Sequence, residues 1–306
     1  MAFKGPSPFP KGAGPFHSRT AGRRRAPDSR ERGREIKAKK AIALPLLAGL
    51  LLAAFACGGG VENEATPGTE TPCPSCGDSW VVDGTPLPPG QVCVPQVPAE
   101  GQANLFRNPG FESGENPWCV MHLPKFEVSQ EQSHTGQSSA LLQMQVPAGT
   151  TGTRVYYLVH EVEVQEFPEL ISGYYRVEKW ARGTPRQYLQ FVVIALGATN
   201  MPGGFSNHQV RYPLAGISED PFAISNAFFV YIGTEEPAAG QWVYFERNIK
   251  QDFQSLWGAV PQGFSKIRVL FEVRFDDKEA GAPAEAEVYY DDLYMGPASE
   301  NPNSPD

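Results

Sequence analysis

The chain has 306 residues, 41% of them hydrophobic, and a formal net charge of −8 at pH 7. Residues 1–40 hold 12 Lys/Arg and 3 Asp/Glu, so from totals of 26 and 34 the remaining chain has 14 basic and 31 acidic residues. A net charge near −17 on that part excludes the basic surface that phosphate binding needs, and we predict no nucleic-acid partner.

Residues 1–57 are typical of a secretory signal with an unusually long basic extension. A basic segment ends at Lys40, and the run from Ala41 to Ala56 is apolar and free of charge. Its 16 residues are too few for a spanning helix, which needs about 20. Ala54-Phe55-Ala56-Cys57 resembles the lipobox of bacterial lipoproteins. This resemblance implies export, lipidation of Cys57 and an extracytoplasmic or cell-surface location on the membrane; cleavage without lipid and a short uncleaved anchor are the alternatives.

Residues 58–102 are predicted to be a linker, because they hold eight prolines, six acidic residues and no Lys or Arg. Cys73-Pro-Ser-Cys76 has a spacing found in redox and zinc sites, but a zinc ribbon needs a second close pair. Disulfides are favoured in an exported chain. Four cysteines allow three pairings, so the pairing stays open. The candidates are Cys73, Cys76, Cys93 and Cys119, and a bond between the last two would fix the end of the linker to the domain.

Beyond residue 103 the main pattern is the period-2 alternation of β-strands. In Lys266–Phe275, hydrophobic residues occupy alternate positions while Arg268, Glu272 and Arg274 share the other face with Leu270. Turn residues separate this segment from other β-rich runs, which predicts an all-β sandwich. These runs are 153–164, 171–180, 188–196, 227–232 and 242–249.

Two further segments interrupt the strand pattern. Residues 197–226 form a long insertion rich in Gly, Pro, Asn and Ser, within which Val210–Ile217 is a candidate edge strand. One or two helical turns are predicted in Gln251–Trp257.

Three sequence motifs, in their order along the chain, resemble those of one protein family. They are Asn104-Leu-Phe-Arg-Asn-Pro-Gly-Phe-Glu-Ser-Gly114, Ser133-His-Thr-Gly-Gln-Ser-Ser-Ala140 and Glu287-Val-Tyr-Tyr-Asp-Asp-Leu-Tyr-Met295. The chain thus resembles jelly-roll carbohydrate-binding modules of the cellulose- and xylan-binding, galactose-binding-like type. The resemblance implies a jelly-roll β-sandwich over residues 103–297, with the first and last motifs as its first and last strands. Residues 298–306 are predicted to be a disordered tail.

The same resemblance implies a structural calcium ion near one end of the sandwich. Its ligands would be Glu112, the backbone carbonyl of Gln137, and Asp291. Calcium suits this set because it takes six to eight hard oxygen ligands. His134 stands where the family sometimes has an acidic residue. The alternative is that Asp291 and Asp292 only end a strand.

Within residues 171–180, the side chains that alternate with the core positions form a candidate ligand surface. Aromatic and charged side chains there suit a sugar, because rings stack on its C–H face and polar groups bind its hydroxyls. The candidates are Tyr174, Arg176, Glu178 and Trp180, extended by Tyr188, Gln190, Arg268, Glu272 and Arg274 if these strands are neighbours. The 197–226 loop is predicted to overhang this face. The alternative is a half-solvated face with cross-strand ion pairs.

The sequence lacks the motifs of common hydrolases, such as H-E-x-x-H and G-x-S-x-G. We therefore predict no catalytic residues and a surface-anchored lipoprotein that binds carbohydrate without catalysis. The net charge favours a neutral glycan unless Arg176, Arg268 and Arg274 form a local basic patch. A structural or adhesive lipoprotein that binds another protein is the alternative, and a glycan-active enzyme is disfavoured. The oligomeric state stays open.

Overall fold

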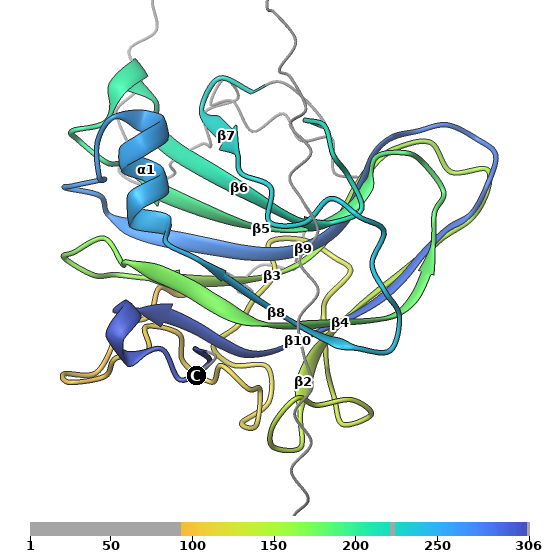
Figure 1. Ribbon diagram of the computed structural model, residues 1–306, viewed down its shortest axis with the longest axis horizontal. Helices are drawn as coiled ribbons and strands as arrows, with labels where there is room; N and C mark the ends of the chain where they lie inside the picture. The colour runs from red at the N-terminus through yellow and green to blue at the C-terminus, as the bar shows by residue number, and fades with distance from the viewer. Residues whose placement is uncertain (1–92, 221–223, 305–306) are drawn as a thin grey trace, which may run out of the picture. The chain divides into compact units, whose positions relative to one another are not determined.

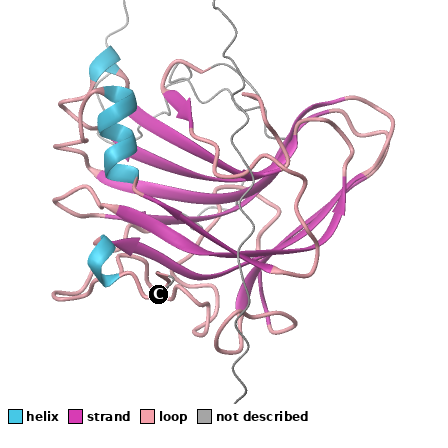
Figure 2. Ribbon diagram, viewed as in Figure 1, coloured by secondary structure: helices cyan, strands magenta, loops and turns pink. Residues whose placement is uncertain are grey.

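The computed structural model describes residues 93–220 and 224–304, which fold into two five-stranded sheets packed as a sandwich (Figures 1 and 2). The strands are β1 (Glu127–Ser129), β2 (Ser139–Val146), β3 (Gly152–Val162), β4 (Leu170–Ala181), β5 (Gln187–Leu196), β6 (Asn207–Ala215), β7 (Ala227–Phe229), β8 (Trp242–Arg247), β9 (Lys266–Lys278) and β10 (Ala284–Gly296). Helix α1 spans Ile249–Trp257, and short 3-10 turns span Pro202–Gly204 and Ala298–Glu300.

The strand order is that of a jelly roll. Sheet 1 has the order β1-β2-β10-β4-β8, and sheet 2 has the order β3-β9-β5-β6-β7. Strands β2 to β5 alternate between the sheets, and all pairs are antiparallel except β6 with β7. The predicted all-β jelly-roll sandwich is confirmed. The last motif lies in β10, the last strand, but the expectation that the first motif is a strand is wrong, because residues 104–114 form turns. The two motifs still meet, since the amide of Leu105 donates to the carbonyl of Met295 over 2.8 Å.

The core lies between the sheets and follows the predicted alternation of β9. Its apolar side chains at 267, 269, 271, 273 and 275 are all fully buried. One aromatic cluster joins the first motif to this strand: Phe106 packs on Trp118, His160 and Phe271 with ring centroids 5.2, 5.3 and 6.0 Å away. The N-terminal segment therefore belongs to the core of the sandwich.

The folded part begins earlier than predicted. The linker prediction is wrong for residues 93–102, because Gln96 forms a parallel bridge with Val162 and its amide donates to Glu161 over 2.8 Å. A disulfide between Cys93 and Cys119 confirms one of the candidate pairings. Residues 1–92 lie outside the described part, and with them Cys57, Cys73 and Cys76.

The C-terminal end is also ordered further than predicted. The expectation of a disordered tail is wrong for residues 298–304. Two asparagines supply the polar contacts that hold this segment on sheet 1. Asn301 accepts from the Ser172 hydroxyl over 2.8 Å, and Asn303 donates to the carbonyl of Asp292 over 2.6 Å.

The 197–226 segment contains β6, which pairs with β5 along one side. Its first residues also pair with β7, so the predicted edge strand has a neighbour on both sides there. The predicted helical turns correspond to α1, where Asn248 caps the N-terminus by accepting from the Gln251 amide. Gly258 ends the helix with φ +78°, a conformation that favours glycine. Across the described residues, every helix is too short or too polar to cross a membrane.

Candidate functional site

The nine predicted ligand residues divide between the two sheets. Strand β4, with Tyr174 and Arg176, lies between β10 and β8 in sheet 1, whereas β5 and β9 are neighbours in sheet 2. The expectation that β5 and β9 extend the β4 face is therefore wrong, because the jelly-roll connection sends consecutive strands to opposite sheets. For the same reason the expectation that the 197–226 segment overhangs the β4 face is wrong for its strand β6, which belongs to sheet 2.

A β-bulge further divides the β4 residues. Val177 pairs with Val288, but Lys179 pairs with Glu287, so Glu178 is an extra residue in the ladder. After a one-residue shift, side chains exchange faces. Trp180 accordingly packs against the core, and its indole N–H donates to Glu236 over 3.1 Å. Trp180 is therefore not on the face that carries Tyr174 and Arg176, contrary to the prediction.

The remaining β4 residues already contact other side chains. The ring of Tyr174 is stacked on His134, with centroids 3.6 Å apart and planes at 18°. Arg176 forms an ion pair with Glu178 at 2.8 Å. The face is thus half-solvated, as in the alternative expectation, but the Arg176–Glu178 pair lies within β4 and is not a cross-strand pair.

The outer face of sheet 2 contains a cavity of about 220 Å³. Its floor is apolar, with Val192, Ile194 and Leu270 side by side on β5 and β9. Long polar side chains surround the floor. They are Tyr157 on β3, Arg211 on β6, and Arg268, Glu272 and Arg274 on β9. Three of the predicted ligand residues, those on β9, thus line one cavity.

The strand register fixes how these side chains are arranged. Tyr157 and Gln190 flank Glu272 in one row across the sheet. In the next row, Val192 lies between Leu270 and Arg211. The row after that places Ile194 between Arg268 and Gln209. The apolar floor therefore lies between Arg211 on one strand and Arg268 on another.

At one end of the cavity a buried polar network holds Arg274, which is 1% exposed. Its guanidinium bridges two carboxylates, Glu272 and Asp276. The Tyr188 hydroxyl donates to Asp276 over 2.7 Å, and the amide of Gln190 donates to Glu272. Tyr188 and Gln190 are fully buried, so these two predicted ligand residues lie beneath the surface and hold Asp276 and Glu272 in place.

At the other end Glu161 binds two cations. Its oxygens accept from Lys266 and from Arg268, each over 2.7 Å. Arg211 lies between the two ends, is 4% exposed, and donates to the side chain of Gln209 over 2.7 Å. Burial lowers the pKa of the Arg211 guanidinium to about 10.

The wall on the β3 side comes from a loop that sequence reasoning did not assign to the site. Met121 and His122 line the cavity, and the His122 ring lies 5.1 Å from Tyr157 at 82°. Cys119 fixes this loop through its disulfide and through two backbone hydrogen bonds with Val159. Arg211 and Gln209 were also missed, although their alternation with the buried Val210 is a signal that marks them as one face.

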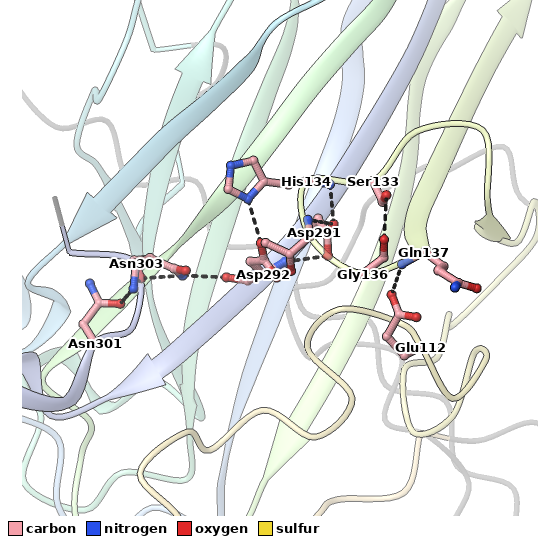
Figure 3. A network of polar contacts seen from close by, with 11 residues as sticks. Glu112, Ser133, His134, Gly136, Gln137, Asp291, Asp292, Asn301 and Asn303 are labelled. Carbon is pink, nitrogen blue, oxygen red and sulfur yellow. Dashed lines mark hydrogen bonds and ion pairs between the residues drawn. The ribbon is translucent and has the colours of Figure 1, made fainter.

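The predicted calcium residues meet at one turn, residues 133–138 (Figure 3). Glu112 accepts from the amides of Gln137 and Ser138, each over 2.8 Å. Asp291 accepts from the amides of His134 and Thr135 over 2.7 and 3.3 Å. The two carboxylates therefore hold opposite ends of the turn. Gln137 contributes its N–H to Glu112, whereas the prediction concerned its carbonyl.

Asp291 and its neighbour differ in their surroundings. Asp291 is fully buried, and burial raises the pKa of its carboxyl to about 7. Asp292 is partly exposed and contacts His134 Nδ1 over 2.7 Å. Among the described residues, no group of three or more His, Cys, Asp or Glu is placed to hold a metal. A calcium ion here would depend on two carboxylates together with backbone oxygens.

Gly136 is required at this turn. Its φ is +63°, and a Cβ atom there would lie 2.3 Å from Oε1 of Glu112. The glycine thus allows Glu112 to approach the backbone of the turn.

The strand order and the cavity define a two-sheet jelly-roll domain with a polar-rimmed cavity on one outer face. No family model and no curated protein matches the sequence. Solved structures of similar fold include carbohydrate-binding modules. One is TmCBM61 in complex with β-1,4-galactotriose, with 15% identity over 63% of this chain and 98% of that chain and a TM-score of 0.34.

Two other similar structures are the CBM22-1 xylan-binding domain from Paenibacillus barcinonensis Xyn10C and an endo-β-1,4-glucuronan lyase from Trichoderma reesei. The first has 17% identity over 61% of this chain and 90% of that domain, with a TM-score of 0.33. The second has 12% identity over 58% and 88%, with a TM-score of 0.35. These likenesses concern the fold alone.

Proposed function

We propose that the jelly-roll domain binds an oligo- or polysaccharide, without catalysis, in the cavity on the outer face of sheet 2. One observation carries the proposal: an apolar floor of Val192, Ile194 and Leu270 is surrounded by side chains that form hydrogen bonds. A pyranose has the matching surface, with apolar C–H faces and a rim of hydroxyls. Ligand sites commonly combine an apolar lining with a few polar groups in this way.

The size of the cavity limits what it can enclose. Its volume of about 220 Å³ is below the roughly 300–1,000 Å³ of pockets for drug-sized ligands. One sugar ring is the natural occupant, and further residues of a chain would lie outside. We therefore expect weak, reversible binding that depends mainly on a single ring.

Blocking the cavity should remove binding. Val192→Phe would place a ring on the floor and is expected to weaken glycan binding at least tenfold in calorimetric titration. Tyr174→Ala, on sheet 1, is the matched control and should bind within about twofold of wild type. The opposite result, loss in Tyr174→Ala with normal binding in a folded Val192→Phe, would move the site to the β4 face.

The absence of any glycan binding by the wild-type domain would lead to a different conclusion. If no neutral or acidic glycan binds the wild-type domain at millimolar concentration, carbohydrate binding is wrong. The structural or protein-adhesive function then takes its place.

We further propose that the domain is held on a membrane by a lipid on Cys57, which lies outside the described residues. The support is the order of basic segment, apolar run and small residues before this cysteine. Cys57→Ser should move the protein from the membrane fraction to the soluble fraction of the producing cell. Unchanged membrane association of this variant would contradict lipid anchoring.

We also propose a calcium ion at the 133–138 turn, held by Glu112, Asp291 and backbone oxygens. The support is the fully buried carboxylate of Asp291, which forms no ion pair with any described residue. A cation there would compensate its charge. It would also stabilise the fold by mass action, by about 2.7 kcal/mol at a hundredfold excess over Kd.

The melting temperature tests this site. Chelation should lower it in wild type and have no effect in Asp291→Asn. Asp292→Asn is the matched control and should keep the response to chelator, because Asp292 interacts with His134 at the surface. A wild-type melting temperature that changes with neither calcium nor chelator would exclude the calcium site.

A further inference from the structure

The outer face of sheet 2 differs in charge from the rest of the exported chain. Seven charged side chains on the strands of sheet 2, whose contacts are described above, lie along this face. They are Lys266, Arg268, Arg274 and Arg211 against Glu161, Glu272 and Asp276. These seven comprise four cations and three anions, whereas the chain after residue 40 has 14 basic and 31 acidic residues.

The positive charge is concentrated at the middle and one end of the cavity. Arg274 is balanced at the far end by two carboxylates, Glu272 and Asp276. Glu161, in contrast, is shared by two cations, Lys266 and Arg268. The Arg211 side chain donates to the neutral Gln209. The Glu272 carboxylate, which also faces Arg274, favours the charged form of Arg211. A ligand above the floor thus meets more positive than negative charge on the side of Arg211 and Arg268.

The geometry suits a planar anion. Arg211 and Arg268 extend from adjacent rows of the sheet on opposite sides of Val192 and Ile194. Guanidinium groups bind carboxylates through paired N–H donors, and this interaction strengthens where water is excluded. Burial of Arg211, which lowers its pKa to about 10, shows that its charge is costly to bury there. A bound carboxylate would reduce that cost.

We propose that the cavity selects a sugar that carries a carboxylate, a uronic acid residue, over its neutral counterpart, and that Arg211 and Arg268 determine this specificity. The inference rests on the proposed carbohydrate binding and adds the class of sugar. The net charge of the exported chain favours a neutral glycan, but the local arrangement of charges governs a ligand that enters the cavity. Arg176, on sheet 1, takes no part.

The test compares glycans that differ only in the carboxylate. Oligomers of β-1,4-glucuronate and cello-oligosaccharides of equal length have the same linkage, and they differ at C6. Oligogalacturonate and its methyl ester form a second such pair. Calorimetric titration of the wild-type protein at pH 7 should show at least tenfold tighter binding of the acidic member of one pair. This preference should decrease as the salt concentration rises from 20 to 300 mM, because salt screens the charges and the Debye length falls to about 6 Å at 300 mM.

Three variants locate the specificity. Arg211→Gln and Arg268→Gln should each weaken binding of the acidic glycan about tenfold or more, and each should lower the preference for the acidic over the neutral glycan at least fivefold. Arg176→Gln, on sheet 1, should change neither. Because Arg211 is buried, thermal melting must show that its variant is folded; Arg268 is partly exposed and carries the test if the Arg211 variant unfolds.

The outcomes separate the two claims. Equal binding of acidic and neutral glycans, or an acidic preference that survives both arginine variants, overturns the specificity and leaves carbohydrate binding intact. Failure of all four glycans to bind removes the proposed function itself.

Discussion

Replacing Arg274 by methionine should lower the free energy of unfolding by about 3–5 kcal/mol. The arginine is 1% exposed and is the cation between Glu272 and Asp276, which are themselves buried. Methionine would fill similar space but leave two carboxylates close together without that cation. Urea unfolding followed by tryptophan fluorescence measures the change.

The matched control is Arg176→Met. This arginine also pairs with a glutamate two residues away, but the pair lies at the surface, with side chains 18% and 34% exposed. Exposed ion pairs contribute about 0–1 kcal/mol, so the control should lose no more than that. Equal losses in the two variants would mean that the network around Arg274 contributes nothing beyond an ordinary surface pair.

Lowering the pH from 7.5 to 4.5 should destabilise the wild-type protein by about 2–3 kcal/mol relative to His160→Gln. His160 is fully buried between Phe106 and Trp118, and its Nε2 accepts the amide of Arg107. Burial, with a smaller effect of Arg107, lowers its pKa to about 3. His160 therefore takes up a proton near pH 6.5 in the unfolded chain but only near pH 3 in the folded chain. Stability is lost as the pH falls below 6.5.

The glutamine variant serves as the reference because it keeps a hydrogen-bond acceptor and does not titrate. Other groups, such as Asp291 with its raised pKa, change in both proteins and cancel in the difference. Urea unfolding at several pH values provides the comparison. Parallel pH profiles for wild type and variant would mean that His160 is protonated as readily in the folded state as in the unfolded chain.

The sequence predicts the sandwich well where alternation is uninterrupted. On β9 every second residue from Ile267 to Phe275 is buried in the core, and Arg268, Glu272 and Arg274 point to the opposite side, as predicted. The same reasoning fails on β4, because the bulge at Glu178 reverses the faces beyond it. A bulge inserts one residue into the ladder without changing the residue types around it, so the pattern of Tyr174 to Trp180 does not indicate it.

The site is less predictable than the fold because it depends on which strands are neighbours. Arg211 joins the cavity only because β6 pairs with β5, and His122 because its loop is fixed to β3. Both contacts connect residues far apart in sequence. The Cys93–Cys119 pairing was one of three possibilities, and the fold decides it by placing both cysteines beside β3.

The attachment of Cys93 has a mechanical consequence. Tension that pulls the chain on the N-terminal side of Cys93 would reach the domain first through a covalent bond to Cys119. From there it would pass to β3 through the hydrogen bonds that Cys119 makes with Val159. Met121 and His122 follow directly in the chain and form one wall of the cavity. A load on the N-terminal side would therefore be transmitted to the edge of the cavity on sheet 2, and the shape of the proposed site would depend on how strongly the domain is pulled.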